Sequence, residues 1–107
     1  KFDTGMGRIG FVCSEDNFDL AVSEAKQVAA LPSIKVTGAF THFASADEPD
    51  EDGIAYTKLQ FSRFCRACDA LKAQGVDVGI RHCCNSAAIL CFPEMHLDMV
   101  RAGIILF

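Results

Sequence analysis

The amino-acid sequence predicts a single α/β domain in which parallel strands alternate with helices. Segments rich in β-branched and aromatic residues alternate strictly with stretches whose apolar residues recur at helical spacing. Such alternation implies right-handed crossovers between parallel strands. The chain has 107 residues, half of them hydrophobic, and no internal repeat or linker, which suits one small domain with a core. The expected strands are 1–3, 34–43, 76–80 and 99–107, and the expected helices are 18–29, 54–74 and 86–91.

The charge and the apolar pattern exclude several classes of protein. The formal net charge of −4 argues against a nucleic-acid partner, which would favour a basic face. No apolar run is long enough to span a bilayer, and the first residues do not resemble a signal peptide. We therefore expect a cytoplasmic protein that binds neither nucleic acid nor membranes.

The cysteines include ligand types for zinc, but core packing explains them better. Cys65 and Cys68 lie three positions apart on an expected helix, and Cys83 and Cys84 follow His82 directly. A zinc ion takes such ligands. Adjacent cysteines, however, seldom both reach one ion, and the helical spacing of the other two suits a buried face. We expect all six cysteines to be reduced, small and partly buried, and no metal site.

Capping residues and proline place the first helix and the strand that follows it. Ser14–Asn17 offers side chains that cap a helix start, and the helical pattern continues to the stop at Pro32. The next strand, 34–43, is expected to end at or near His42.

The second helix follows an acidic loop. Residues 47–52 carry five acids and could hold a divalent cation, but such a run is typical of a solvated loop. We expect the helix to begin near Ile54, with Asp52 as its cap, and to end before Gly75. Its apolar face is expected to comprise Phe61, Phe64, Cys65, Cys68 and Leu71. Pro93 halts the short third helix, and Gly103 interrupts the last strand.

The first ten residues form a glycine-rich segment around one arginine. Gly5, Gly7 and Gly10 permit turns that other residues resist and let another group approach the main chain. Arg8 lies between them, and its planar fork of donors suits a carboxylate or a phenolic oxygen. An ordinary turn with a solvated arginine is the alternative.

The polar candidates fall at or just after the expected carboxyl ends of strands. Lys1, Arg8, His42, His82 and Ser86 all occupy such positions. Functional residues of parallel sheets collect at this edge. One shared site is therefore plausible on topology alone.

Some of these residues also have a purely structural interpretation. His42 could be a core histidine bonded to a backbone carbonyl. Ser86, with Asn85, could cap a helix, although a helix start also binds phosphate. Arg101 lies inside an apolar strand, where an unpaired charge is costly, so it needs a partner such as a histidine or a ligand nitrogen.

Taken together, these residues lie in four segments that resemble the middle of alanine racemase, a fold-type III pyridoxal-phosphate enzyme built on a TIM barrel. The segments keep the family's order and extend over nearly the whole chain. The resemblance implies pyridoxal 5′-phosphate as cofactor, alanine as substrate and a homo-oligomer. The matching segments are KFDTGMGRIG at 1–10, THFASAD at 41–47, His82 with Asn85–Ala88, and Asp98–Arg101 with Gly103 and Ile104.

The resemblance also implies a role for each matching residue. Arg8 corresponds to the arginine that contacts the phenolic-oxygen side of the cofactor and the substrate carboxylate. Lys1 corresponds to a lysine that many members carbamylate, whose new negative charge holds that arginine. Arg101 corresponds to the arginine that faces the pyridine nitrogen and leaves it unprotonated. His42 corresponds to the histidine bonded to this arginine.

The remaining matches concern the phosphate of the cofactor. Ser86 and the backbone at Gly103 and Ile104 correspond to the phosphate-binding residues, and TIM barrels commonly bind phosphate after their last two strands. His82 and Asn85 match family positions with a supporting role.

By this resemblance, residues 1–107 form part of the alanine racemase N-terminal domain, the C-terminal half of a barrel that takes about 250 residues when complete. The family's cofactor lysine and its tyrosine base, which the partner subunit supplies, are not among them. We expect the parent protein to interconvert L- and D-alanine for the cell wall, and residues 1–107 alone to be inactive.

Two alternatives remain open. A half barrel could be a cofactor-free module that self-associates through its strand edges and apolar interior face. Another fold-type III protein could bind pyridoxal phosphate or racemise a different amino acid.

Overall fold

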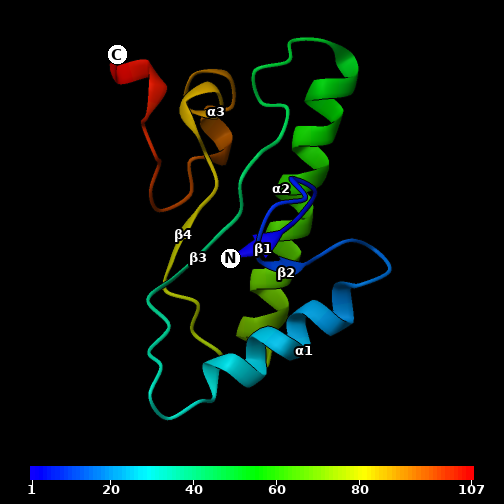
Figure 1. Ribbon diagram of the computed structural model, residues 1–107, viewed down its shortest axis with the longest axis vertical. Coiled ribbons are helices and arrows are strands. Elements are labelled where there is room, and N and C mark those ends of the chain that lie inside the picture. The colour runs from blue at the N-terminus through cyan, green and yellow to red at the C-terminus, as the bar shows by residue number, and fades with distance from the viewer.

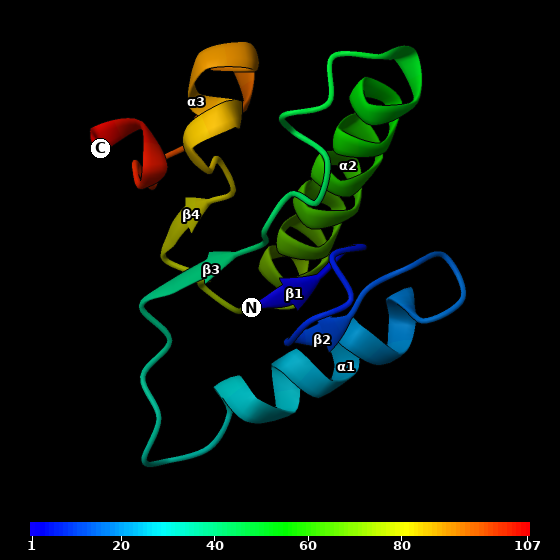
Figure 2. The same ribbon diagram turned by 45° about the horizontal axis from the view of Figure 1, so that its top comes forward.

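The longest element of the computed structural model, which describes residues 1–107, is a helix on one side of four short strands (Figure 1). A second helix crosses the C-terminal half of this long helix, and both views show the two in contact (Figure 2). The elements are β1 (Phe2–Asp3), β2 (Phe11–Val12), α1 (Phe18–Ala29), β3 (Gly38–Phe40), α2 (Glu51–Ala73), β4 (Ile80–His82), α3 (Ser86–Cys91), η1 (Pro93–Met95) and η2 (Ile104–Leu106).

The prediction of an α/β fold with parallel strands is confirmed, but the strands form two separate pairs and not a single sheet. β1 pairs only with β2, and β3 pairs only with β4, each in parallel. No backbone ladder joins the two pairs. They are held together by side chains, as described below.

The β1–β2 pair was not expected, because parallel strands usually need a long crossover between them. Here a loop of seven residues closes the pair, with Phe2 opposite Phe11 and the Phe11 N–H bonded to the Lys1 carbonyl at 2.9 Å. The loop can turn this sharply because Gly5, Gly7 and Gly10 all have positive φ.

The β3–β4 pair is shorter than the strands predicted at 34–43 and 76–80. Gly38 lies opposite Ile80 and Phe40 opposite His82, and pairing fades beyond Thr41. The second strand begins later than expected, because Gly79 has a φ of +70° and turns the chain just before Ile80. His82 is therefore the last residue of a strand instead of following one.

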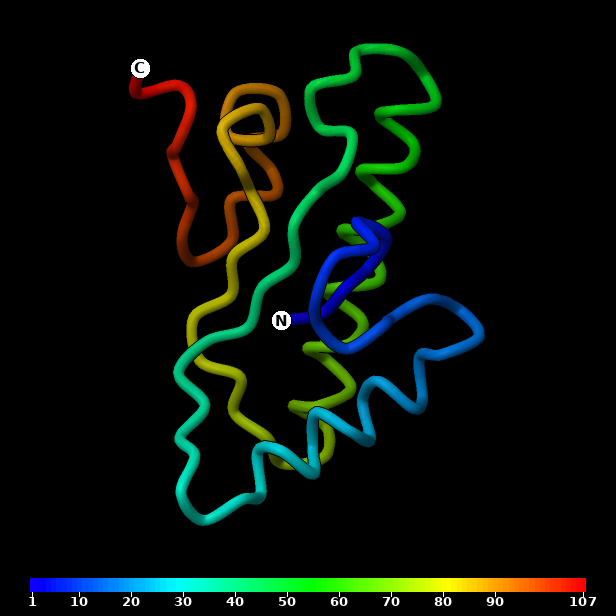
Figure 3. The backbone as a smooth tube through the Cα atoms, in the orientation of Figure 1, coloured from blue at the N-terminus to red at the C-terminus, as the bar shows by residue number.

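The final strand predicted at 99–107 is largely absent. Met99 makes one isolated parallel bridge to His82, and the Arg101 N–H bonds to the Cys84 carbonyl at 3.0 Å. The segment therefore runs beside β4, as Figure 3 shows, but residues 104–106 coil into η2. Beyond Gly103 there is no neighbouring strand to complete a ladder, and an unpaired strand gains no hydrogen bonds.

Helices α1 and α3 have the predicted bounds, whereas α2 begins earlier than predicted. Asp50, not Asp52, is its N-cap: the Asp50 carboxylate accepts a hydrogen bond from the Gly53 N–H at 2.7 Å. Glu51 and Asp52 then occupy the first turn, where negative charge is favourable.

The core lies between α2 and the strands. Phe64 of α2 is fully buried and packs against Phe2 of β1, with their ring centroids 6.4 Å apart. The buried stripe of α2 differs from the predicted one, since Phe61 and Cys65 are only partly buried. It consists of Gly53, Thr57, Gln60, Phe64, Ala67, Cys68 and Leu71.

The six cysteines are all free thiols, as expected. Four are buried and Cys65 is partly buried, but Cys91 at the end of α3 is exposed, contrary to the expectation for all six. Burial raises the pKa of Cys68 to about 12 and holds the pKa of Cys83 above its usual range. These thiols therefore stay protonated and behave as small hydrophobic side chains.

Candidate functional site

Arg101 is the centre of a polar cluster at the carboxyl ends of β3 and β4. Its NH1 group donates to Nδ1 of His82 at 2.8 Å, and its NH2 group donates to the Thr41 carbonyl at 3.0 Å. NH2 also lies 3.4 Å from Nδ1 of His42 and 3.3 Å from the Cys83 carbonyl. These contacts supply the partners that a half-buried guanidinium requires.

Both histidines of this cluster are held neutral. Arginine can only donate, so Nδ1 of His82 accepts and its proton lies on Nε2. Burial and then the charge of Arg101 lower the pKa of both His42 and His82 below 6.5. The cluster therefore carries one permanent cation beside two uncharged rings.

The ring of Phe40 forms a wall of the cluster. It stacks on the His82 imidazole with 5.0 Å between centroids and 5° between planes. The Arg101 guanidinium lies 5.4 Å from the same ring and the Lys1 Nζ lies 5.9 Å from it. Two cations thus lie over one aromatic ring, whose faces favour positive charge electrostatically.

A pocket of about 440 Å³ opens beside Arg101. This volume is in the range of small-molecule sites. The exposed Asp47 is one of its lining residues. Six of the predicted site residues also line it: His42, Asn85, Ser86, Arg101, Gly103 and Ile104.

One wall of the pocket directs backbone N–H groups at a hydroxyl oxygen. Oγ of Ser86 accepts from the Gly103 N–H at 3.0 Å and from the Ile105 N–H at 3.4 Å. The Ile104 amide, which was predicted to take part, is not one of these donors. Asn85 caps α3 through the Ala88 N–H at 3.1 Å and reaches the Phe43 carbonyl with its amide nitrogen.

Lys1 and Arg8 do not line this pocket. Nζ of Lys1 is buried and has no hydrogen-bond partner. Arg8 is exposed, and its backbone N–H donates to the Asp3 carboxylate at 2.9 Å. Gly5 and Gly7 donate to the same carboxylate, and although burial works against ionisation, these three N–H groups hold the pKa of Asp3 below its ordinary value.

Several polar residues that connect the site to the rest of the protein were missed in the sequence. Thr4 and Thr41 follow β1 and β3 directly, are fully buried, and join their hydroxyl oxygens at 2.6 Å. Gln60 is buried on α2 among apolar side chains. The sequence did contain one signal for a buried polar residue: Thr57 and Gln60 lie three residues apart on the helix face that also carries Phe64.

The chain resembles alanine racemases over its whole length. The family model for the alanine racemase N-terminal domain matches residues 1–107. The alanine racemase of Desulfovibrio desulfuricans is 52% identical over 107 residues, which is 100% of this chain and 27% of that protein. The alanine racemase of Clostridium tetani is 49% identical over 105 residues, 98% of this chain and 25% of that protein.

Solved structures agree with the sequence comparison. The alanine racemase of Clostridium difficile 630, in complex with cycloserine, has a TM-score of 0.86 and 42% identity, over 99% of this chain and 27% of that one. The alanine racemase of Bacillus anthracis with bound L-Ala-P has a TM-score of 0.74 and 34% identity, over 95% of this chain and 25% of that one.

Fold and site together define an α/β protein whose polar pocket lies where parallel strands end. The chain belongs to the alanine racemase N-terminal domain family. It spans about a quarter of the length of the curated relatives it matches. None of its helices has the length and apolar character that crossing a membrane requires.

Proposed function

We propose that the protein is a pyridoxal-phosphate-dependent alanine racemase that interconverts L- and D-alanine, and that residues 1–107 form the last strands of its barrel with half of the cofactor site. The observation that carries the proposal is Arg101, held between His82 and the Thr41 carbonyl on a pocket wall that also holds the Ser86 hydroxyl. The ligands of the two structural relatives, cycloserine and L-Ala-P, support an amino-acid-like substrate.

The Ser86 wall fits a phosphate group. The Gly103 and Ile105 N–H groups already converge on one oxygen, the Ser86 Oγ, which is the arrangement that a phosphate oxygen requires. The proton of that hydroxyl remains available as a further donor. A methyl group at Gly103 would lie 3.7 Å from Ser86 Oγ and would partly fill this end of the pocket.

The Arg101 wall fits a pyridine nitrogen. NH1 and NH2 make the contacts within the chain, whereas Nε makes none, so the guanidinium keeps donors for a ligand. Burial lowers the pKa of Arg101 from 12.5, yet an arginine stays charged at neutral pH. A permanent donor of this kind leaves a ring nitrogen without a proton.

When bound, pyridoxal phosphate supplies a ring that withdraws electrons from the α-carbon of an amino acid. The residues of this chain bind and orient: Ser86 and Gly103 hold the phosphate end, and Arg101 restrains the ring nitrogen. His42 and His82 orient Arg101 without adding charge. Arg8 lies on the glycine loop and is proposed to meet the substrate carboxylate.

The bases that move protons are proposed to come from outside residues 1–107. No lysine and no tyrosine lines the pocket. The one tyrosine, Tyr56, donates its hydroxyl proton to the Gly5 carbonyl at 2.6 Å. Residues 1–107 alone are therefore proposed to bind but not to racemise.

Calorimetric titration with pyridoxamine phosphate tests the proposal, because its amine does not react with surface lysines. Saturable binding that Arg101→Ala and Ser86→Ala each weaken about tenfold or more would support the cofactor site, with Arg66→Ala, which does not line the pocket, as a matched control. Absence of binding by the protein expressed from its complete open reading frame would refute it and favour a cofactor-free module. Racemisation of alanine by the same preparation tests the activity.

A further inference from the structure

Gln60 is a buried polar side chain whose every hydrogen-bonding group has a partner. It has no exposed surface, although its neighbours on the helix stripe are mostly apolar. Oε1 accepts from the Ala44 N–H at 2.9 Å, and Nε2 donates to Oγ1 of Thr4 at 3.2 Å and to the His42 carbonyl at 3.1 Å. Burying an amide is costly unless it is satisfied in this way.

These partners belong to two different sheets. Thr4 follows β1, whereas His42 and Ala44 follow β3, and no backbone ladder joins the two strand pairs. The one direct hydrogen bond between the two strand ends is the bond between the Thr4 and Thr41 hydroxyls. The Gln60 amide therefore supplies the other polar connections between the strand ends.

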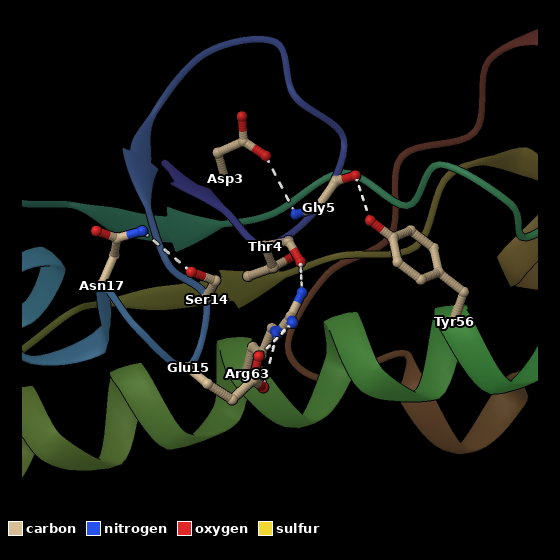
Figure 4. A network of polar contacts seen from close by, with 8 residues as sticks. All are labelled: Asp3, Thr4, Gly5, Ser14, Glu15, Asn17, Tyr56 and Arg63. Atoms are coloured by element: carbon tan, nitrogen blue, oxygen red, sulfur yellow. Dashed lines mark hydrogen bonds and ion pairs between the residues drawn. The ribbon is translucent and has the colours of Figure 1, made fainter.

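Two further side chains of α2 hold the same segment. Tyr56 donates to the Gly5 carbonyl at 2.6 Å, and NH1 of Arg63 donates to the Thr4 carbonyl at 2.8 Å (Figure 4). Nε and NH2 of Arg63 donate to the Glu15 carboxylate. Tyr56, Gln60 and Arg63 lie four and three residues apart, on one helix face. We call these three residues the α2 clamp.

The glycine loop is tied to the clamped segment. Asp3, the last residue of β1, accepts hydrogen bonds from the N–H groups of Gly5, Gly7 and Arg8. The position of residues 3–5 therefore sets the position of the loop that carries Arg8. On the other side, the backbone of His42 sets where its imidazole meets Arg101 at 3.4 Å.

We propose that Gln60 is a positioning residue that fixes the Arg8 loop relative to the His42–Arg101 pair. That the Arg8 loop meets the substrate and the His42–Arg101 pair meets the cofactor rests on the function proposed above. The coupling between their positions through Gln60 does not depend on that function. An apolar residue at 60 would leave the Ala44 N–H and the His42 carbonyl buried without partners, and both strand ends would loosen.

Hydrogen exchange in the protein expressed from its complete open reading frame tests the coupling. In Gln60→Met, we expect the Ala44 amide to exchange about tenfold faster or more, because it loses its acceptor. The loop amides of Gly5, Gly7 and Arg8 should accelerate as well, although their N–H groups bond to Asp3 and none bonds to Gln60. Thr57→Val is the matched control, since it removes an equally buried hydrogen bond that stays within α2.

The outcomes separate coupling from simple destabilisation. Equal acceleration of all amides in both variants, or acceleration of Ala44 without the loop, would overturn the proposal. If Gln60→Met does not fold, Thr4→Val gives the reciprocal test: it removes the hydroxyl on the β1 side and should accelerate residues 42–44. Unchanged exchange there would also overturn it.

A second arm keeps the two proposals apart. Gln60→Met should weaken binding of pyridoxamine phosphate about tenfold while Thr57→Val leaves it unchanged, as expected for the loss of about one satisfied buried hydrogen bond. If the unmodified protein binds no pyridoxamine phosphate, the cofactor assignment fails and the exchange experiment still decides the coupling. If it binds and Gln60→Met binds equally well, Gln60 does not position the site.

Discussion

The Tyr56 hydroxyl donates a 2.6 Å hydrogen bond to the carbonyl oxygen of Gly5, and a Cβ at Gly5 would collide with that same hydroxyl. Gly5 also has a φ of +144°, a conformation that L side chains rarely adopt. The glycine and the tyrosine are therefore a matched pair. Because Gly5 has no side chain, the Tyr56 hydroxyl of α2 can come close enough to bond to the backbone of the loop.

This pairing predicts that the two residues are energetically coupled. Gly5→Ala should lower the free energy of unfolding by about 2 kcal/mol or more through strain and collision. Tyr56→Phe should cost about 1 kcal/mol through the lost hydrogen bond. The double variant should cost less than the sum, because phenylalanine removes the atom that the new methyl strikes first. Denaturant unfolding of all three variants measures the coupling.

Gly7 offers the control for this cycle. It also has a positive φ, +74°, but a Cβ there would meet no atom within 4 Å. Gly7→Ala should therefore carry only the backbone strain, and its cost should be the same with tyrosine or phenylalanine at 56. Strict additivity of Gly5→Ala and Tyr56→Phe would show that the collision does not occur.

The Arg101 cluster predicts a particular response of the two histidines. In Arg101→Met, the pKa values of His42 and His82 should rise, because a neighbouring positive charge is gone. They should nevertheless remain below 6.5, since burial is the largest cause of the lowering. Titration of the imidazole resonances by NMR measures both. Arg66→Met should leave them unchanged, because Arg66 lies over the Phe18 ring and does not line the pocket.

The same pKa values predict how stability depends on pH. Since the pKa of each histidine is lowered on folding, the unfolded chain binds more protons between the folded value and 6.5. The free energy of unfolding should therefore rise with pH across that window and fall as the pH drops below 6.5.

A variant can isolate the contribution of one histidine. In His82→Asn the side-chain oxygen can still accept from Arg101, but nothing titrates at this position. Urea unfolding at several pH values below 6.5 should give a shallower dependence of the unfolding free energy on pH for this variant. An unchanged slope would assign the pH dependence to other groups.

The sequence predicted helices better than strands, for a physical reason. The bounds of α1 follow from its apolar spacing, since the Asn17 side chain bonds to Ser14 and makes no cap, and those of α3 follow from the Asn85 cap. Both signals lie in nearby residues of the sequence. Strands depend on partners: 34–43 shortens to Gly38–Phe40 because β4 offers only three paired positions, and residues beyond Gly103 find no ladder at all. The pairing of β1 with β2 depends on three glycines with positive φ acting together, and no single one of these residues predicts the pairing.

The candidate site shows the same division. His42, Ser86 and Arg101 were identifiable because their chemistry is unusual for their positions, and the structure brings them to one pocket. Thr4, Thr41 and Gln60 were not, because each is ordinary by itself and its role depends on contacts with residues 16 or more positions away in the sequence. Arg8 was predicted from its glycine neighbours, yet the structure leaves it exposed beside the pocket and not within it.

Ser86 gives the sharpest prediction about the pocket, because one oxygen serves two neighbours. Ser86→Ala removes the acceptor of the Gly103 and Ile105 N–H groups and the donor proposed for phosphate. We expect the affinity for pyridoxamine phosphate to fall about tenfold or more, as for loss of a hydrogen bond to a charged group. Affinity for pyridoxamine, which lacks the phosphate, should not change.

The comparison of the two ligands makes this result interpretable. If Ser86→Ala weakened both equally, the serine would support the shape of the pocket and would not bind phosphate. Asn85→Ala provides the structural control, since it removes the α3 cap at the neighbouring position and leaves the Ser86 hydroxyl in place. A loss specific to the phosphorylated ligand in Ser86→Ala, but not in Asn85→Ala, is expected if the converging N–H groups and the hydroxyl together bind the phosphate.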